Sequence, residues 1–430
     1  PDYLIYVAPV MPKEKALQYH AEFPSGKLSI KVTKPVSTPA ELSLAYTPGV
    51  AEPCLAIENN PQTAYMYTNK SNLVAIISNG TAVLGLGDIG ALASKPVMEG
   101  KSALFKKYAG VDAFDIEVDE KDQQKLVEII TAIAPTFGGI NLEDIKAPEC
   151  FYVENELIKR LNIPVFHDDQ HGTAIVAAAG VKNACEIQGK KLENCKIVVS
   201  GAGAGAIATM NMLVLVGAKR ENFYVFDTKG LITKQRQDLN EFKEPYAQPG
   251  GDVSLQDTLV GCDVFLGLSK GNLLSGDMLH LMADKPIIFA MANPTPEILP
   301  PDARLARPDA IVATGRSDFP NQVNNSLCFP HLFRAALDVQ ASCINDEMKI
   351  ACVNAISALA KEEVPADIQA LYGRSLSFGQ DYIIPSQFDP RLYVRVATCV
   401  AEAAIKTKVT RNKDFDLANY PAFLQQRLAI

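Results

Sequence analysis

The chain has 430 residues, 48% of them hydrophobic and 21% charged, and its 49 acidic residues outnumber 41 basic ones to give a formal net charge of −8. This length predicts two or three domains with cores of their own, and the acidic balance argues against a basic surface for nucleic acid or anionic lipid. Nine cysteines with no C-x-x-C pair predict free thiols, and no apolar run reaches the roughly 18 residues that span a bilayer, so a cytoplasmic protein is expected.

The first part of the chain alternates short apolar strands with helices. Buried strands are predicted at 73–78, 113–118 and 164–166. Helical patterns are predicted at 96–108, 121–134, 149–161 and 171–187. Because parallel strands are joined by crossover helices, this rhythm predicts an α/β domain with a parallel sheet over residues 1–187.

The helix predicted at 96–108 carries a lysine on its apolar face, and Pro96 is placed in its first turn. The apolar residues of that face are Val97, Met98, Leu104, Phe105 and Tyr108. Lys101 belongs to the same face. Such a lysine either snorkels to the surface or pairs with a buried carboxylate, or it is a base whose pKa is lowered by burial. The pattern alone leaves these alternatives open.

Two pairs of acidic residues follow apolar strands. Glu143 and Asp144 end one strand, and Asp168 and Asp169 end the next, one helix later. Neighbouring parallel strands lie about 4.8 Å apart and end at one edge of the sheet, so we expect the two pairs to lie close together. Clustered carboxylates repel each other unless a cation neutralises them, and oxygen ligands favour Mg²⁺ or Mn²⁺.

Two other interpretations of this segment were weighed. His167 and His171, four residues apart, could bind zinc beside the aspartates, but no third soft ligand lies nearby in the sequence. Asp144 or Asp169 could instead cap a helix. We favour the hard-metal site because two acidic pairs flank a single β-α unit.

A polar stretch at 188–194 marks a predicted domain boundary, after which a second α/β pattern begins. Further strands are predicted at 195–200, 222–226, 263–266, 286–291 and 310–313. The first of them runs into a turn in which Gly201, Gly203 and Ala206 fill the small-residue positions of G-x-G-x-x-[G/A]. Phosphates would lie at the N-terminus of the following helix, so we expect a Rossmann-type dinucleotide-binding domain at 188–330.

The residues near the expected ribose do not decide between NAD and NADP. Asp227 closes the next strand, where a carboxylate would hydrogen-bond a free ribose and repel a 2′-phosphate. Lys229, two residues further on, could offset that charge and reach the phosphate. We therefore expect NAD or NADP as the cofactor.

The segment 331–430 is mainly helical. Helices are predicted at 331–340, 346–361 and 391–407, and the stretch 365–390, with several Pro, Gly and Ser residues, is interpreted as an extended surface arm. These helices are too few to form a domain with its own core, so the segment is expected to pack back on the first domain.

Together these signals predict the oxidation and decarboxylation of a 2-hydroxy acid. A metal would hold the hydroxyl and carboxylate oxygens while a base removes the hydroxyl proton during hydride transfer, and it would then polarise the new ketone for loss of CO₂. An acid must finally protonate the enolate carbon. Tyr46 precedes a Pro-Gly turn and is a candidate for this acid, although a lone tyrosine is more often structural.

With these residues in place, the sequence resembles the malic enzymes, and within them a shorter, bacterial-type branch that converts malate to pyruvate and CO₂. The matching segments occur in order and are specific as a set. They are AYTPGVAEPC (45–54), AVLGLGDIGALASKPVMEGKSALFK (82–106), NLEDI (141–145), VFHDDQHGTAI (165–175), VVSGAGAGA (198–206), ANPTPEI (292–298) and ATGRSDFPNQVNN (313–325).

The resemblance implies roles for three catalytic residues. Lys101 matches the general base of the M-E-G-K segment, and Tyr46 matches the acid of the Y-T-P-G segment. Asp168 is similar to the carboxylate that supports the lysine.

The resemblance also implies the metal and substrate ligands. Glu143, Asp144 and Asp169 match the metal ligands of the family. Asn293 and Asn325 match amides that bind the substrate, and we expect Asn293 to contact the dinucleotide as well.

One position departs from the longer, animal-type members, which carry a substrate arginine just before the L-G-L-G-D segment. Ala82 stands there in this chain, so the second substrate carboxylate needs another partner, such as helix N-termini or the two asparagines. The resemblance implies a homodimer or homotetramer acting on a small molecule, without nucleic acid or membrane. Malolactic-type decarboxylation to lactate, or a catalytically inactive dinucleotide-binding regulatory subunit, are the alternatives to oxidative decarboxylation of (S)-malate.

Overall fold

Two separate sheets organise the chain, in a computed structural model that describes residues 12–83 and 85–428. The first sheet has the order β2-β1-β3-β4, and all of its strands run parallel. Its strands are β1 (Leu73–Ser78), β2 (Asp112–Glu117), β3 (Gly139–Leu142) and β4 (Val165–His167). The three strands predicted in this region are confirmed, and their ends differ by no more than a single residue.

The second sheet has the order β10-β9-β8-β5-β6-β7, and only its edge strand β7 runs antiparallel. Its strands are β5 (Ile197–Ser200), β6 (Phe223–Asp227), β7 (Gly230–Leu231), β8 (Val264–Gly267), β9 (Ile287–Ala290) and β10 (Ile311–Thr314). The strand order reverses between β5 and β8, which is the switch point of a doubly wound fold. The predicted Rossmann-type domain is therefore confirmed.

Helices cover both faces of this second sheet. In β5, Ile197 and Val199 belong to the large core shared with the first sheet, whereas Val198 belongs to a second apolar cluster on the other face. Three short helices contribute to that second cluster: α10 (Leu255–Thr258), α11 (Gly276–Leu279) and α12 (Pro300–Ala306). Burial on both faces explains why these strands read as continuous apolar runs.

Four longer helices connect and cover the first sheet: α5 (Ala91–Ala109), α6 (Gln123–Ile133), α7 (Glu149–Arg160) and α8 (Asp168–Gln188). The prediction that Pro96 lies in the first turn of its helix is wrong, because α5 begins at Ala91 and Pro96 is inside it. A proline there cannot donate to the carbonyl of Leu92 one turn earlier, and Leu92 lies on the exposed side of the helix, where it is 83% exposed.

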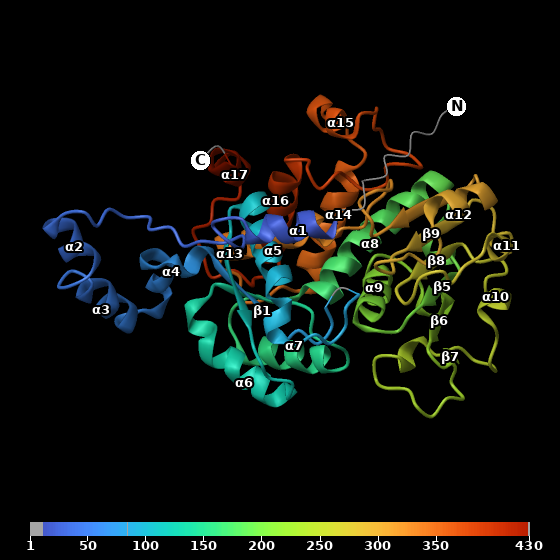
Figure 1. Ribbon diagram of the computed structural model, residues 1–430, viewed down its shortest axis with the longest axis horizontal. Coiled ribbons are helices and arrows are strands. Elements are labelled where there is room, and N and C mark those ends of the chain that lie inside the picture. The colour runs from blue at the N-terminus through green and yellow to red at the C-terminus, as the bar shows by residue number, and fades with distance from the viewer. Residues whose placement is uncertain (1–11, 84, 429–430) are drawn as a thin grey trace.

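Helix α8 joins the two sheets. It starts at the end of β4 and packs against α9 (Ala204–Leu215), the first helix of the second domain (Figure 1). Most of its residues are small or apolar and buried, and it ends at Gly189, whose φ of 69° is the left-handed conformation of a helix cap. This shared helix fixes the two sheets relative to each other.

The C-terminal helices pack back on the first part of the chain, as predicted. They are α13 (Phe329–Asp338), α14 (Asp346–Leu359), α15 (Ala366–Tyr372), α16 (Arg391–Lys406) and α17 (Tyr420–Leu428). Helix α13 packs on α5, and α14 packs on α8 and α16 (Figure 1). The interpretation of 365–390 as a surface arm is wrong, because this stretch contains α15 and the buried Ile383 and Ile384.

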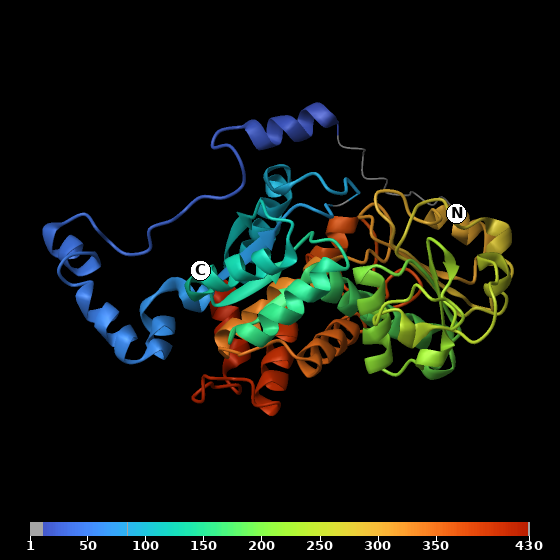
Figure 2. The same ribbon diagram turned by 90° about the horizontal axis from the view of Figure 1, so that it is seen from below.

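The segment 12–67, which we call the N-terminal arm, contrasts with the rest of the chain because its helices bury no side chains. It contains α1 (Lys13–Ala21), α2 (Pro39–Ala45), α3 (Ala51–Asn59) and α4 (Ala64–Tyr67). Helices α2 and α3 stand away from both sheets in two perpendicular views (Figures 1 and 2).

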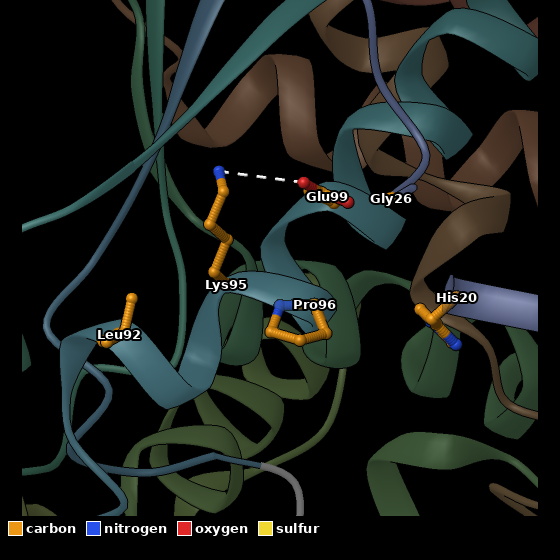
Figure 3. Close-up of a pocket in the computed structure, with 6 residues that line it drawn as sticks. All are labelled: His20, Gly26, Leu92, Lys95, Pro96 and Glu99. Carbon is orange, nitrogen blue, oxygen red and sulfur yellow. Dashed lines mark ion pairs between the residues drawn. The ribbon is translucent and has the colours of Figure 1, made fainter. Parts of the chain in front are cut away.

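The start of the arm, as far as it is described, contacts the body of the protein at α5. The backbone N–H of Lys27 donates to Oε2 of Glu99 on α5 at 3.0 Å. A shallow hollow forms beside this contact, between α1, the turn after it and α5 (Figure 3). It is lined by His20, Gly26, Leu92, Lys95, Pro96 and Glu99.

No helix within the ranges 12–83 and 85–428 is long and apolar enough to cross a membrane. The two sheets fall inside the predicted domains 1–187 and 188–330, and the helices α14 to α17 inside 331–430. The boundaries themselves stay a prediction, and residues 1–11, 84, 429 and 430 of these ranges lie outside the described part.

Candidate functional site

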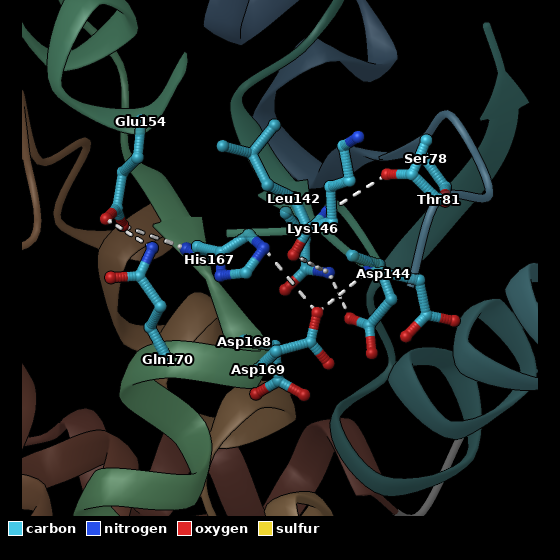
Figure 4. Close-up of polar contacts among 12 residues, drawn as sticks. Ser78, Thr81, Leu142, Asp144, Lys146, Glu154, His167, Asp168, Asp169 and Gln170 are labelled. Atoms are coloured by element: carbon cyan, nitrogen blue, oxygen red, sulfur yellow. Dashed lines mark hydrogen bonds and ion pairs between the residues drawn. The ribbon is translucent and has the colours of Figure 1, made fainter. Parts of the chain in front are cut away.

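Three carboxylates converge where β3 and β4 end side by side. Because these strands pair in parallel, Glu143 and Asp144 after β3 emerge at the same edge as Asp169 after β4. Figure 4 shows Asp144 and Asp169 at this edge. One oxygen from each residue lies within 4.8 Å of the others. The backbone N–H of Asp144 donates to Oδ2 of Asp169 at 2.7 Å and ties the strand ends together. The structure thus brings together the three residues predicted as metal ligands.

This donor set fits a hard divalent cation. All three donors are carboxylates, Glu143 and Asp144 are buried, and Oδ2 of Asp144 has no hydrogen-bond partner among the described residues. Burial, reinforced by the charge of Asp169, raises the pKa of Asp144 to about 8. Burial likewise raises the pKa of Glu143 well above its usual value. A divalent cation would compensate this concentration of negative charge.

Lys101 lies directly beside the three carboxylates. Its Nζ is 2.5 Å from Oδ2 of Asp168 and 3.0 Å from Oε1 of Glu143. The ring of Phe329 covers the ammonium at 4.1 Å from its centre. The lysine side chain is only 11% exposed, so Lys101 does not snorkel to the surface but pairs with two buried carboxylates.

Two buried anions set the direction of the pKa shift of Lys101. Burial alone lowers this pKa, but the charges of Asp168 and Glu143 outweigh burial and raise it above the ordinary value. Of the alternatives that the sequence left open, the structure favours a lysine paired with buried carboxylates over a base whose pKa is lowered by burial. A cation that takes up the charge of Glu143 would remove one of those anions and lower the pKa of Lys101 again.

Asn325 holds Asp168 in place and is itself held by Thr173. Asn325, at the start of a 3₁₀ turn before α13, donates through Nδ2 to Oδ2 of Asp168 at 3.0 Å. Thr173 on α8 donates through its hydroxyl to Oδ1 of Asn325 at 3.2 Å. The amide of Asn325, predicted to contact substrate, therefore lies at the edge of the lysine site and contacts Asp168.

Gly172 leaves the space that the Asp168 carboxylate occupies, because a Cβ at position 172 would lie 1.9 Å from Oδ1 of Asp168. Gly172→Ala must displace this carboxylate and, with it, the ammonium of Lys101. Since a misplaced catalytic group can cost on the order of 100-fold, we expect kcat to fall by about that factor while the affinity for Mn²⁺ is kept. Steady-state kinetics and Mn²⁺ titration check this.

Gly100→Ala is the matched control, because a Cβ at position 100 meets only Cε of Lys27, at 3.7 Å. This variant is expected to keep the wild-type kcat although it alters the residue next to Lys101. A wild-type kcat for Gly172→Ala would show that the position of Asp168 does not matter for the reaction.

The two histidines of this segment both contact Glu154, and His167 also lies near Asp169. Nε2 of His171 lies 2.8 Å from Oε1 of Glu154. The backbone N–H of His167 donates to the same oxygen at 3.0 Å (Figure 4). Nε2 of His167 lies 3.5 Å from Oδ2 of Asp169. The cluster of possible metal ligands contains oxygen donors and neither histidine, which speaks against zinc.

Glu154 belongs to the site but was not predicted from the sequence. It lies on the buried face of α7 and is 5% exposed. Its carboxylate accepts from the backbone of His167 and contacts His171, so it orients the segment between β4 and α8. The available signal was an acidic residue among the apolar positions of an amphipathic helix.

β5 ends in the predicted glycine-rich turn. Gly201 has a φ of 113°, and a Cβ there would lie 2.5 Å from the carbonyl oxygen of Leu268, so no side chain fits. Helix α9 begins directly after Gly203, and a Cβ on Gly203 would meet nothing within 4 Å. Ala206 is 1% exposed inside the helix packing. This open space before a helix N-terminus fits the phosphates of a dinucleotide.

Asp227 ends β6 on the neighbouring strand, and its carboxylate is already engaged. Arg236 contacts its two oxygens at 2.8 and 2.9 Å, and Lys243 contacts Oδ2 at 2.9 Å. The ammonium of Lys229 pairs with Asp238 at 2.8 Å and not with Asp227. Arg236 and Lys243 were missed in the sequence, since they lie in an irregular loop without a motif.

Asn293 lies between the two domains. It follows β9 at the same edge of the second sheet as the glycine-rich turn, and it is exposed. A Cβ on Gly85, which precedes α5 in the first domain, would lie 3.5 Å from the backbone oxygen of Asn293. A Cβ on Gly315 would lie 3.2 Å from its side-chain amide. This placement is compatible with contact to substrate or dinucleotide.

Within one chain, Tyr46 lies apart from the other predicted site residues. It caps α2 in the N-terminal arm, and it is 68% exposed. Helices α2 and α3 stand away from α5, which carries Lys101 (Figure 2).

Comparison with known proteins matches most of the chain. Residues 25–128 match the malic enzyme N-terminal domain, and residues 170–374 match the malic enzyme NAD-binding domain. An NAD-dependent malic enzyme of Rhizobium meliloti (strain 1021) is 57% identical over 408 residues, 94% of this chain and 53% of that protein. An NADP-dependent malic enzyme of Escherichia coli (strain K12) is 56% identical over 411 residues, 94% of this chain and 54% of that protein.

The chain thus spans about half the length of these curated relatives. Among solved structures, a malic enzyme from Pyrococcus horikoshii Ot3 is 41% identical, with a TM-score of 0.89. That match covers 97% of this chain and 96% of the solved one.

Proposed function

Because the chain belongs to the malic enzyme family, we propose that it oxidises and decarboxylates (S)-malate to pyruvate and CO₂ while reducing NAD or NADP, with Mg²⁺ or Mn²⁺ bound. The relatives at 56–57% identity include both an NAD-dependent and an NADP-dependent malic enzyme, which supports a nicotinamide dinucleotide as the oxidant. Their greater length makes the activity of this chain a proposal that needs its own test.

One observation carries the proposal: the expected dinucleotide site adjoins the expected metal site. A Cβ on Gly205, in the first turn of α9, would lie 3.2 Å from the backbone oxygen of Asp169. The helix that would receive the pyrophosphate therefore starts against the segment that carries a metal ligand. Hydride transfer requires substrate and nicotinamide to be in contact, and this adjacency supplies that condition.

Each site residue has its own role in this reaction. As a neutral amine, Lys101 takes the proton of the C2 hydroxyl, and Asp168, itself held by Asn325, keeps the ammonium that results in position. The ring of Phe329 shields the lysine from water on one side. When bound, the divalent cation polarises the substrate oxygens and the nicotinamide accepts the hydride. Tyr46 donates the proton that completes pyruvate.

The activity is tested by incubating the protein with malate, Mn²⁺ and either dinucleotide. We expect the absorbance of reduced nicotinamide to rise together with an equal amount of pyruvate. Lactate without net reduction of the dinucleotide would mean the malolactic reaction instead. Dinucleotide binding without any turnover of malate would mean a regulatory subunit.

We further propose that the chain forms a homo-oligomer through the N-terminal arm, because the arm exposes many large apolar side chains. They include Leu17, Tyr19, Phe23, Ile30, Val32, Leu42, Leu44, Leu55 and Met66. An apolar surface of this kind is typical of a protein–protein interface, and a second copy of the chain is its simplest occupant. Tyr46 would then enter the site of the partner subunit.

Mixing two inactive variants tests this arrangement. A dimer of one Tyr46→Phe chain and one Lys101→Ala chain regains one intact site only if Tyr46 serves the partner subunit. After denaturation and joint refolding at equal concentration, we expect about a quarter of wild-type activity, since half of the dimers are mixed and one of their two sites is intact. Failure to regain activity, with mixed dimers demonstrated by mass spectrometry, would place Tyr46 and Lys101 of one site on one chain.

We also propose a separate role for each of the predicted domains. Residues 1–187 would carry the metal and Lys101, residues 188–330 would bind the dinucleotide, and 331–430 would cover α5 and α8. All nine cysteines lie in the described part and none forms a disulfide there, which supports a location in the reducing cytoplasm.

A further inference from the structure

One buried carboxylate, that of Glu154, holds both ends of the segment that carries Asp168 and Asp169. Glu154 lies on the buried face of α7, is 5% exposed and takes no part in the proposed reaction. The backbone N–H of His167 donates to its Oε1 at 3.0 Å, and Nε2 of Gln170 donates to its Oε2 at 3.3 Å (Figure 4). These two donors stand on either side of the two aspartates in the sequence, so a single carboxylate fixes the segment from which both acidic side chains project.

His171 is the third donor, and the other nitrogen of its ring contacts a lysine of the C-terminal helices. Nε2 of His171 lies 2.8 Å from Oε1 of Glu154. Nζ of Lys349, on α14, lies 3.4 Å from Nδ1 of the same ring. Because an ammonium can only donate, Nδ1 accepts and the ring proton is on Nε2, where it points at Glu154. Lys349 thus fixes the tautomer in which His171 donates, and α14, which packs on α8, takes part in holding the segment.

The segment held in this way places the ring of His167 against a metal ligand. His167 is fully buried, so its ring has no room to turn toward solvent. Its Nε2 lies 3.5 Å from Oδ2 of Asp169, the same oxygen that accepts from the backbone N–H of Asp144 at 2.7 Å. Because Glu154 holds the backbone of His167, it determines where that ring meets Asp169 (Figure 4). A series of contacts therefore runs from α14 to the three clustered carboxylates.

We propose that Glu154 and His171 position the metal ligand Asp169 and thereby set the affinity of the protein for Mn²⁺. Lys349 belongs to the same arrangement because it fixes the tautomer of His171. The proposal rests on the proposed function only for the expectation that a divalent cation binds to the three clustered carboxylates. These are positioning residues, since they act on Asp169 through the backbone and ring of His167. Residues that orient metal ligands in this way contribute roughly 10- to 100-fold to metal affinity.

Titration of Mn²⁺ followed by electron paramagnetic resonance, without malate or dinucleotide, tests the proposal on the whole chain. Glu154→Leu removes the carboxylate and keeps the bulk of the side chain, so we expect Mn²⁺ to bind about tenfold more weakly. Glu154→Gln still offers an oxygen to the backbone N–H of His167. Its affinity should therefore lie between those of Glu154→Leu and the wild type.

His171→Phe is a second variant, and it tests the proposal even if Glu154→Leu fails to fold. A phenyl ring can keep the packing of the imidazole beside Phe166, whose ring centre lies 5.6 Å away, but it cannot donate to Glu154. We expect this variant also to bind Mn²⁺ about tenfold more weakly. Thermal unfolding shows whether each variant folds, and each affinity is measured well below the unfolding temperature.

Glu156→Gln is the matched control, because it removes the same charge from the same helix. The side chain of Glu156 is 22% exposed and its carboxylate pairs with Lys159 at 2.9 Å. This variant should bind Mn²⁺ as tightly as the wild type. Equal weakening in Glu156→Gln would overturn the proposal, because the effect would then come from the charge of α7 and not from the position of Asp169.

An unchanged Mn²⁺ affinity in either folded variant, Glu154→Leu or His171→Phe, would also overturn the proposal. A lower unfolding temperature with wild-type affinity counts as this outcome, since the residue would then serve stability alone. Absence of Mn²⁺ binding by the wild-type protein would refute the metal site of the proposed function and this proposal with it. Binding by the wild type with unaltered affinity in the variants would refute this proposal alone.

Discussion

Replacing Lys101 by alanine is expected to lower kcat for malate oxidation on the order of 1,000-fold, because it removes the group that accepts the hydroxyl proton. The lysine is 11% exposed and contacts Asp168 and Glu143, and the alanine side chain offers no base in its place. KM for malate should change far less, since the metal ligands remain. Steady-state kinetics with saturating Mn²⁺ measure both quantities.

Lys106→Ala is the control and should behave as the wild type, because the side chain of Lys106, on the same helix, is 61% exposed. A small primary amine added to Lys101→Ala should restore part of kcat, because it can occupy the space beside Asp168 and act as the base. A purely structural lysine would not be rescued in this way. Equal turnover by Lys101→Ala and the wild type would remove Lys101 from the mechanism.

Asp169→Asn is expected to weaken Mn²⁺ binding by at least about 100-fold, because it removes one anionic oxygen from a site of three carboxylates. An asparagine keeps the size of the side chain, and its oxygen can still accept from the N–H of Asp144, which is 2.7 Å away in the wild type. The loop should therefore keep its shape while the metal affinity falls. Titration of free Mn²⁺ by electron paramagnetic resonance measures the affinity directly.

Asp414→Asn provides the matched control, since Asp414 is exposed in the loop between α16 and α17. Its Mn²⁺ affinity should equal that of the wild type. Retained Mn²⁺ affinity in Asp169→Asn would show that the cation lies elsewhere, even if activity were lost. Activity at raised Mn²⁺ concentration should recover in part if the defect is one of binding.

The strands and the carboxylate cluster could be predicted because local patterns determine them. β1 is buried at all six positions, so its sequence is a continuous apolar run with an unambiguous start and end. Glu143 and Asp169 follow such strands, and parallel pairing alone brings their carboxylates to one edge. The inward position of Lys101 followed in the same way from the spacing of its helix.

The features that the sequence did not predict depend on contacts between groups that no local sequence pattern links. α5 begins five residues before Pro96, although a proline in a sequence usually indicates the first turn of a helix. Asp227 and Arg236, which form an ion pair, are nine positions apart in the sequence, with the edge strand β7 and a turn between them. The pKa of Lys101 depends on two anions that come from different strands. Tyr46 is exposed in the N-terminal arm, and the place proposed for it in a partner subunit's site involves contacts beyond a single chain.

Malate deuterated at C2 tests whether one site performs both the oxidation and the decarboxylation of malate. The deuterium is expected on the reduced nicotinamide, with equal amounts of reduced dinucleotide, pyruvate and CO₂, and Lys101→Ala should form these products about 1,000-fold more slowly. Formation of lactate and CO₂ without deuterated dinucleotide, or of oxaloacetate without CO₂, would mean that oxidation and decarboxylation are not coupled at one site.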